Sequence, residues 1–260
     1  VVFWSSGILK EAVLLSALGF FAYHFYQLFG SDRRFRNYLM VLVMSCVLIV
    51  MKLYVFMAFF PAILIWFVVT KWKRNIWVYL GCYVAFLILA TLMGELNPRY
   101  DFINLIVDKQ KQFINLADFY EVNSGFQMNA LSYDFWSVLR ASPEAIINVF
   151  TKPWPTEINS VLFVPAFLEN VLIIILIILS LVYRKTLNKK QWDFIIFCVS
   201  FSIILFAVIG LTTPITGAIV RYKIPAIPFL FIAIFMFMNP KKLPNIFTEN
   251  KFSQWVNTFL

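Results

Sequence analysis

A small set of isolated cations could bind an anionic group. Most of the other Lys and Arg residues form tight clusters, whereas these four lie singly or in a pair near the predicted ends of apolar segments. Arg binds phosphate oxygens in a bidentate manner, and Lys supplies a mobile point charge. The sequence therefore favours phosphate or pyrophosphate binding, although anchoring at the membrane interface is the alternative for each. The four residues are Lys10, Lys52, Arg221 and Lys223.

Polar and aromatic neighbours of these cations could line the same site. Tyr222 stands between Arg221 and Lys223, after a run of hydroxyl-bearing residues, Gly and Pro. Tyr54 follows Lys52 at a spacing of two. The segment before Lys10 adds Trp4, Ser5 and Ser6 as candidate lining residues.

Carboxylates provide the candidates for a general base. Glu169 lies inside an apolar segment, where a carboxylate is costly and therefore a functional candidate by default. Glu95, Asp101 and Glu157 lie near predicted membrane edges, and any of them could act as a base or bind a divalent cation. Their spacing is not specific, so solvated loop carboxylates are the alternative. With His24 as its single histidine, the chain has no recognisable metal-ligand pattern, and we expect no metal site.

The composition predicts a membrane protein that would position these residues. The chain is 62% hydrophobic and only 13% charged, whereas soluble domains carry about 25% charged residues. Several apolar runs approach the ~20 residues that cross a hydrocarbon core as a helix. The net charge of +9 is concentrated in short clusters beside these runs. It therefore indicates membrane topology, and we reject nucleic-acid binding.

The basic clusters predict which loops are cytoplasmic. Tight clusters near residues 33–36, 71–74, 184–190 and 241–242 follow or precede the apolar segments, and such clusters favour the cytoplasmic side. The segment 38–70 has clusters at both ends and would be about 50 Å long as one helix at ~1.5 Å per residue. We therefore predict a hairpin of two short helices that turns near Lys52. The other predicted membrane segments are 8–28, 76–93, 160–183, 192–211 and 224–238.

The long polar stretch is predicted to lie outside the membrane. Residues 97–159 hold five cations and seven carboxylates, without the positive bias of the clusters. Apolar residues at helical spacing after Phe102 predict an interfacial helix. A second helix is predicted to start at Ser142-Pro143-Glu144 and to stop at Lys152-Pro153.

The resulting fold class is an all-α polytopic membrane protein. It has about seven membrane segments, including the short hairpin, and a periplasmic loop of amphipathic helices. The predicted regions are the N-terminal membrane segments with the hairpin (1–96), the periplasmic interfacial helices (97–159), the C-terminal membrane segments (160–239) and a cytoplasmic tail (240–260).

Three stretches of this chain resemble a family of membrane enzymes. FWSSGILKEA, PEAIINVFTKPWPTEINSVLFVPAFLEN and TPITGAIVRYKIPAIPFL look like the C-terminal halves of bacterial proteins of cell-surface polysaccharide loci, which are grouped with the GT-C membrane glycosyltransferases. The resemblance implies an inner-membrane enzyme that uses a polyprenyl-phosphate-linked sugar at the outer face. It implies Lys10, Arg221 and Lys223 as phosphate ligands. The family's catalytic carboxylate lies in an earlier outer loop, which we expect upstream of this sequence.

Two other functions remain open at the level of the sequence. A non-catalytic subunit of an inner-membrane complex is compatible with the absence of a recognised active-site motif and with the 30 Phe residues. A transporter of a lipid-linked sugar would need Glu169 and Lys52 to line a path open to both sides. The expected partners are membrane lipid, a polyprenyl-linked sugar and other membrane subunits.

Overall fold

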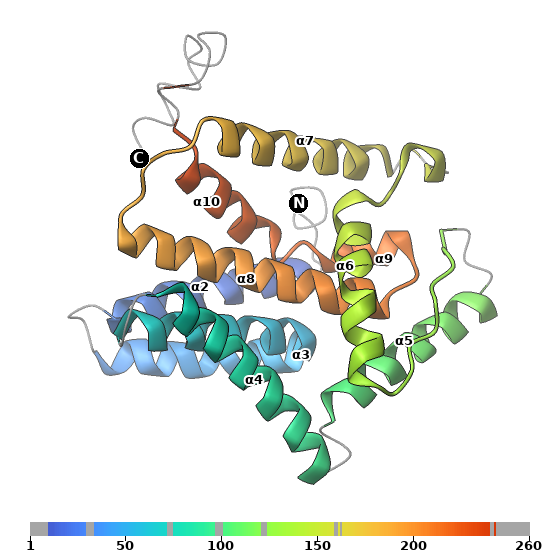
Figure 1. Ribbon diagram of the computed structural model, residues 1–260, viewed down its shortest axis with the longest axis horizontal. Helices are drawn as coiled ribbons and strands as arrows, with labels where there is room; N and C mark the ends of the chain where they lie inside the picture. The colour runs from blue at the N-terminus through green and yellow to red at the C-terminus, as the bar shows by residue number, and fades with distance from the viewer. Residues whose placement is uncertain are drawn as a thin grey trace.

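The described part of the chain is helical (Figure 1). The computed structural model describes residues 10–29, 34–71, 75–96, 101–120, 124–158, 161, 163–239 and 242. Only isolated β-bridges accompany the helices within these residues, so the all-α class is confirmed there. The elements are α2 (Lys10–Phe29), α3 (Phe35–Lys71), α4 (Ile76–Leu96), α5 (Phe102–Phe119), α6 (Phe135–Thr151), the short 3-10 helix η2 (Pro155–Glu157), α7 (Phe163–Val182), α8 (Lys189–Thr212), α9 (Thr216–Tyr222) and α10 (Ile227–Phe237).

Several helices fit a membrane by length and composition. Among the described residues α3, α7 and α8 are each long and apolar enough to cross one. The pair α9 and α10, bent by 62°, meets the same test as a unit, which raises the number to four. This pattern fits an all-helical, multi-pass membrane protein. The count of about seven segments also needs α2, α4 and a second pass within α3, and it stays a prediction.

The first half of α3 runs antiparallel to α2. Near the end of α2, His24 forms a buried hydrogen bond with Asn37 at the start of α3. Near the start of α2, Glu11 instead accepts a hydrogen bond from Lys52, in the middle of α3. At Lys52 the backbone leaves the helical region, with φ −153° and ψ 89°.

The second half of α3 runs parallel to α2. Phe59 contacts Phe21 edge-on, and farther along both helices Phe67 contacts Phe25. The two halves are therefore antiparallel to each other, which confirms the hairpin predicted to turn near Lys52. The 37 residues of α3 form two arms, each roughly 27 Å long at ~1.5 Å per residue.

Aromatic rings fill the centre of the bundle formed by α2, α3, α8 and α10. The Phe59 ring is fully buried and makes edge contacts with Phe21, Phe197, Phe201 and Phe229. Such ring pairs contribute about 0.5–1.5 kcal/mol each beyond the burial of area. In Figure 1 α8 (orange) crosses this centre, with α10 and α7 on one side and α2 and α3 on the other.

α6 crosses α8 at close range. A Cβ atom at Gly210 of α8 would lie 2.2 Å from the carbonyl oxygen of Ala145 in α6. A glycine is needed here for steric reasons, because any side chain would overlap the α6 backbone. The contact holds α6 at the C-terminal end of α8.

Two local predictions outside the membrane helices were wrong. α6 begins at Phe135 rather than at Ser142, because the Ser142 hydroxyl donates to the carbonyl oxygen of Val138 inside the helix instead of capping its start. Pro143 is accommodated within the helix. The connection from α8 to α10, expected as a loop, contains α9. The predicted end of α6 is confirmed, since the helix ends just before Lys152.

The contacts define two ends of the bundle. At one end the turn of α3 and the last turn of α9 meet the start of α2, and we call this the ionic end. At the other end α2 finishes beside the start of α3, and Asn75 lies near Lys189 at the start of α8. We call this the basic end, because Lys71 and Lys189 belong to it. The ionic end thus holds two of the isolated cations, Lys52 and Arg221, whereas the basic end holds members of the basic clusters.

Candidate functional site

Three charged side chains meet at the ionic end. Nζ of Lys52 donates a 3.1 Å hydrogen bond to Oε1 of Glu11, and Nη2 of Arg221 lies 3.7 Å from the same oxygen. The Glu11 and Lys52 side chains are only 4% and 11% exposed, whereas that of Arg221 is 45% exposed. We call these residues the ionic group. Within the described residues, two cations thus contact one carboxylate, and Arg221 is the more exposed of the two.

The helix termini favour this placement of charge. Glu11 lies in the first turn of α2, and Arg221 lies in the last turn of α9. Helix dipoles stabilise negative groups near the first turn and positive groups near the last, typically by about 0.3–1 kcal/mol. The turn of α3 brings Lys52 to the same Glu11 oxygen that Arg221 approaches.

Two tyrosine rings cover Lys52. Its Nζ lies 4.9 Å from the ring centre of Tyr222 and 6.0 Å from that of Tyr54, and the two rings are 5.8 Å apart. Phe113 of α5 also contacts Tyr222, at 6.3 Å between ring centres. The Tyr54 hydroxyl is buried and has no hydrogen-bond partner within the described residues. Because buried hydroxyls are normally paired, a polar ligand group here would satisfy it.

Lys223 belongs to a second, more enclosed set of residues. It is 2% exposed, and its Nζ donates to Oδ1 of Asn170 on α7. The amide nitrogen of Asn170 in turn donates to the carbonyl oxygen of Lys152 at 2.7 Å, and Lys152 pairs with Glu157. Glu169 also acts electrostatically on Lys223. We call these five residues the Lys223 group, which joins α7, the end of α6 and the α9–α10 connection.

The structure brings together only part of the predicted site. Lys52 and Arg221 come from distant parts of the sequence and both contact Glu11, and Lys52 also lies beside the rings of Tyr54 and Tyr222. Lys223 follows directly after Tyr222 but points its ammonium group towards Asn170 instead. The three predicted cations whose side chains are described therefore divide between two sets of contacts, with Lys52 and Arg221 at Glu11 and Lys223 at Asn170.

The four candidate bases lie in different places, and Glu157 already pairs with Lys152. Asp101 caps α5, where its carboxylate accepts hydrogen bonds from the N–H groups of Ile103 and Asn104. Helix capping alone accounts for an aspartate at this position, so no catalytic role is needed to explain Asp101. Glu169 lies on α7 beside the Lys223 group. Glu95 belongs to α4, but its side chain is outside the described part.

The segment before α2 leaves part of the prediction open. Lys10 begins α2, and its side chain lies outside the described residues. Trp4, Ser5 and Ser6 lie outside them altogether.

Sequence reasoning missed the residues that partner the cations. Glu11 was not among the predicted site residues, yet it is the carboxylate that Lys52 and Arg221 both contact. A carboxylate in the first turn of an apolar helix was the available signal. Asn170 carried no signal beyond being an amide in an apolar run, and its contact with Lys223 spans 53 positions.

The wider comparisons do not assign a function. Among the described residues, no group of three or more His, Cys, Asp or Glu side chains lies close enough together to hold a metal ion. The chain matches no protein-family model, no curated protein and no solved structure. The argument for function therefore rests on the geometry of the ionic end.

Proposed function

We propose that the protein is an integral membrane glycosyltransferase-like protein that acts on a polyprenyl-phosphate-linked sugar. The observation that carries this proposal is the ionic group, in which Arg221 is half-exposed beside an already satisfied Glu11–Lys52 pair. A guanidinium group in this position can bind a phosphate oxygen without breaking that pair. The unpaired Tyr54 hydroxyl offers a further polar contact nearby.

The location of this group supports a site at the outer face. The basic end holds Lys71 and Lys189, and loops of that kind favour the cytoplasm. The ionic end lies across the aromatic centre from it, so the topology rule assigns the ionic end to the periplasmic side of a bacterial inner membrane. We extend the proposal to about seven membrane segments and to α5 and α6 as periplasmic interfacial helices.

The proposed reaction transfers a sugar from its phosphate to a hydroxyl group. The acceptor oxygen forms a bond to the anomeric carbon, while the bond from that carbon to the phosphate oxygen breaks. The phosphate keeps the bonding electron pair, and Arg221 would stabilise that charge. A carboxylate must take the acceptor proton. Among the carboxylates named from the sequence, Glu169 remains the candidate, since the carboxylate of Asp101 already caps α5 and that of Glu157 pairs with Lys152.

Sugar transfer in vesicles tests the proposal. The protein is reconstituted with a radiolabelled polyprenyl-phosphate sugar, and label in a water-soluble glycan is counted. We expect transfer by the natural protein and a loss of at least about tenfold in Arg221→Ala, since a charge-assisted contact is removed. Lys185→Ala, which removes an exposed cation at the basic end, is the matched control. Equal transfer by both variants would contradict the proposal.

One observation favours a non-catalytic subunit instead. Lys52 and Lys223 already have partners inside the chain, in Glu11 and Asn170, so neither needs a ligand to be stable. Under this alternative the purified protein has no transfer activity and copurifies with other subunits in fixed proportion. A transporter is less compatible with the structure, because the packed rings around Phe59 fill the space between the two ends.

A further inference from the structure

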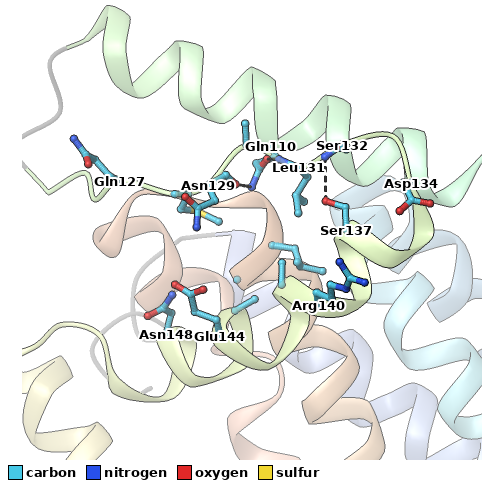
Figure 2. A pocket seen from close by; sticks show the side chains of 16 residues that line it. Gln110, Gln127, Asn129, Leu131, Ser132, Asp134, Ser137, Arg140, Glu144 and Asn148 are labelled. Carbon is cyan, nitrogen blue, oxygen red and sulfur yellow. Dashed lines mark hydrogen bonds between the residues drawn. The ribbon is translucent and has the colours of Figure 1, made fainter.

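A polar cavity lies beside α6, separate from the ionic group (Figure 2). Its volume is about 520 Å³, within the range of about 300–1,000 Å³ that small-molecule sites occupy. One wall is α6, the opposite wall is the irregular segment 127–134 with Gln110 of α5 behind it, and Gly210 and Leu211 of α8 complete the lining.

Side chains at helical spacing line the α6 wall. Arg140, Glu144 and Asn148 follow one another at intervals of four, so they project from one face of the helix. Figure 2 shows them turned towards the cavity, and it draws no hydrogen bond at any of them. Gln127 and Asn129 contribute amide groups from the opposite wall.

The wall opposite α6 is held firmly in place. Gln110 is 1% exposed, and its side-chain amide bonds both the carbonyl oxygen of Asn129, at 3.2 Å, and the N–H of Leu131, at 2.8 Å. The N–H of Ser132 donates to the Ser137 hydroxyl at 3.1 Å, which ties the segment to α6. A cavity with fixed walls loses little entropy when a ligand binds.

The charge of the lining disfavours an anionic ligand. Arg140 is its only cation among the described residues, against the carboxylates of Asp134 and Glu144, so the balance is 1 − 2 = −1. The remaining polar groups are amides and hydroxyls, which donate and accept hydrogen bonds in similar number. This chemistry matches a ligand whose own groups both donate and accept.

We infer that this cavity binds an uncharged, hydroxyl-rich glycan. Sugar hydroxyls are donors and acceptors at once, so they can pair with the Glu144 carboxylate, the Arg140 guanidinium and the Asn148 amide together. No aromatic ring belongs to the described lining, so hydrogen bonds rather than ring stacking hold the glycan. Its role as the acceptor of the transferred sugar rests on the proposed function, but its binding does not.

Binding to uncharged oligosaccharides tests the inference directly. The purified full chain in lipid nanodiscs is titrated with a set of neutral hexose and N-acetylhexosamine oligosaccharides, and separately with inorganic phosphate. We expect at least one neutral oligosaccharide to bind, and the double variant Glu144→Gln, Asn148→Ala to weaken that binding by roughly tenfold or more. Asp118→Asn, which neutralises an exposed carboxylate of α5 away from the cavity, is the control and keeps the affinity.

Several results of these titrations would overturn the inference that the cavity binds a glycan. No binding of any neutral oligosaccharide, or equal affinity in the double variant, excludes a glycan site here. Phosphate binding that the double variant abolishes would assign the cavity to an anion instead. The titration uses no lipid donor, so a protein that binds glycan but transfers no sugar would contradict only the proposed function. Transfer that is insensitive to the double variant, without glycan binding, would contradict only this inference.

Discussion

The two ends of the bundle handle polar side chains in different ways. At the basic end the buried polar groups include the hydrogen-bonded pair of His24 and Asn37 and the Asp193 carboxylate, whereas the cations Lys185 and Lys189 are exposed. At the ionic end Glu11 and Lys52 are charged and almost fully enclosed. Membrane topology accounts for exposed cations but not for buried ones. The difference indicates that charges at the ionic end serve packing or ligand binding.

The largest expected effect comes from breaking the buried ion pair. Glu11→Gln removes the carboxylate that the enclosed Lys52 contacts, and removal of one partner of a buried pair costs about 3–5 kcal/mol. We expect a large drop in the thermal unfolding temperature of the protein in detergent. Glu11→Gln combined with Lys52→Met should recover most of this loss, because no buried charge then remains. An unchanged unfolding temperature in Glu11→Gln would show that the pair does not stabilise the fold.

A tight helix crossing gives the next largest effect. Gly210→Ala places a Cβ 2.2 Å from the backbone oxygen of Ala145, so α6 must shift, at a cost of about 1–3 kcal/mol. Gly19→Ala is the matched control, since nothing lies within 4 Å of a Cβ there and alanine is favoured in a helix by up to about 1 kcal/mol. The unfolding temperature should therefore fall in Gly210→Ala and rise in Gly19→Ala. A neutral Gly210→Ala would mean that α6 is not held against α8.

The hydrogen-bonded pair of His24 and Asn37 at the basic end should contribute less to the stability of the fold. Asn37→Ala removes the 3.0 Å contact between its side-chain oxygen and Nδ1 of His24. Loss of one buried hydrogen bond costs about 1–3 kcal/mol, less than the loss of a buried charge partner. Chemical unfolding monitored by tryptophan fluorescence can rank this variant against Glu11→Gln. If Asn37→Ala proves the more damaging of the two, the contrast between the ends is wrong.

Patterns within one segment predicted more of this structure than contacts between segments did. The hairpin at Lys52 follows from a long apolar run with a single charge between two basic clusters, so length and topology sufficed. The start of α6 was misplaced because Ser142 and Pro143 resemble a helix start, although the preceding residues continue the helix. Ser142 satisfies its hydroxyl within that helix.

The site was predicted in part for the same reason. Arg221 and Lys52 stood out because topology did not explain them. Glu11, the carboxylate that both cations contact, did not stand out in the sequence. It lies 41 positions from Lys52, and their pairing depends on the packing of α2 against α3. The polar cavity beside α6 had no sequence signal, because its walls come from the three helices α5, α6 and α8 and the irregular segment 127–134.

The smallest expected change in stability belongs to Arg221, the residue on which the proposed function rests. Arg221 is 45% exposed and 3.7 Å from Glu11, and exposed ion pairs contribute about 0–1 kcal/mol. The Arg221→Ala variant should therefore be about as stable as the natural protein and still lose binding of the proposed lipid-linked phosphate.

Affinity for a polyprenyl monophosphate tests the central claim most directly. Nanodiscs carrying the natural protein, Arg221→Ala or the control Lys185→Ala are titrated with the same lipid, and bound lipid is counted by native mass spectrometry. We predict that Arg221→Ala lowers the affinity by about tenfold or more, while Lys185→Ala leaves it unchanged. Equal affinity in all three proteins, or an equal loss in both variants, would contradict the claim that the ionic end binds a lipid-linked phosphate.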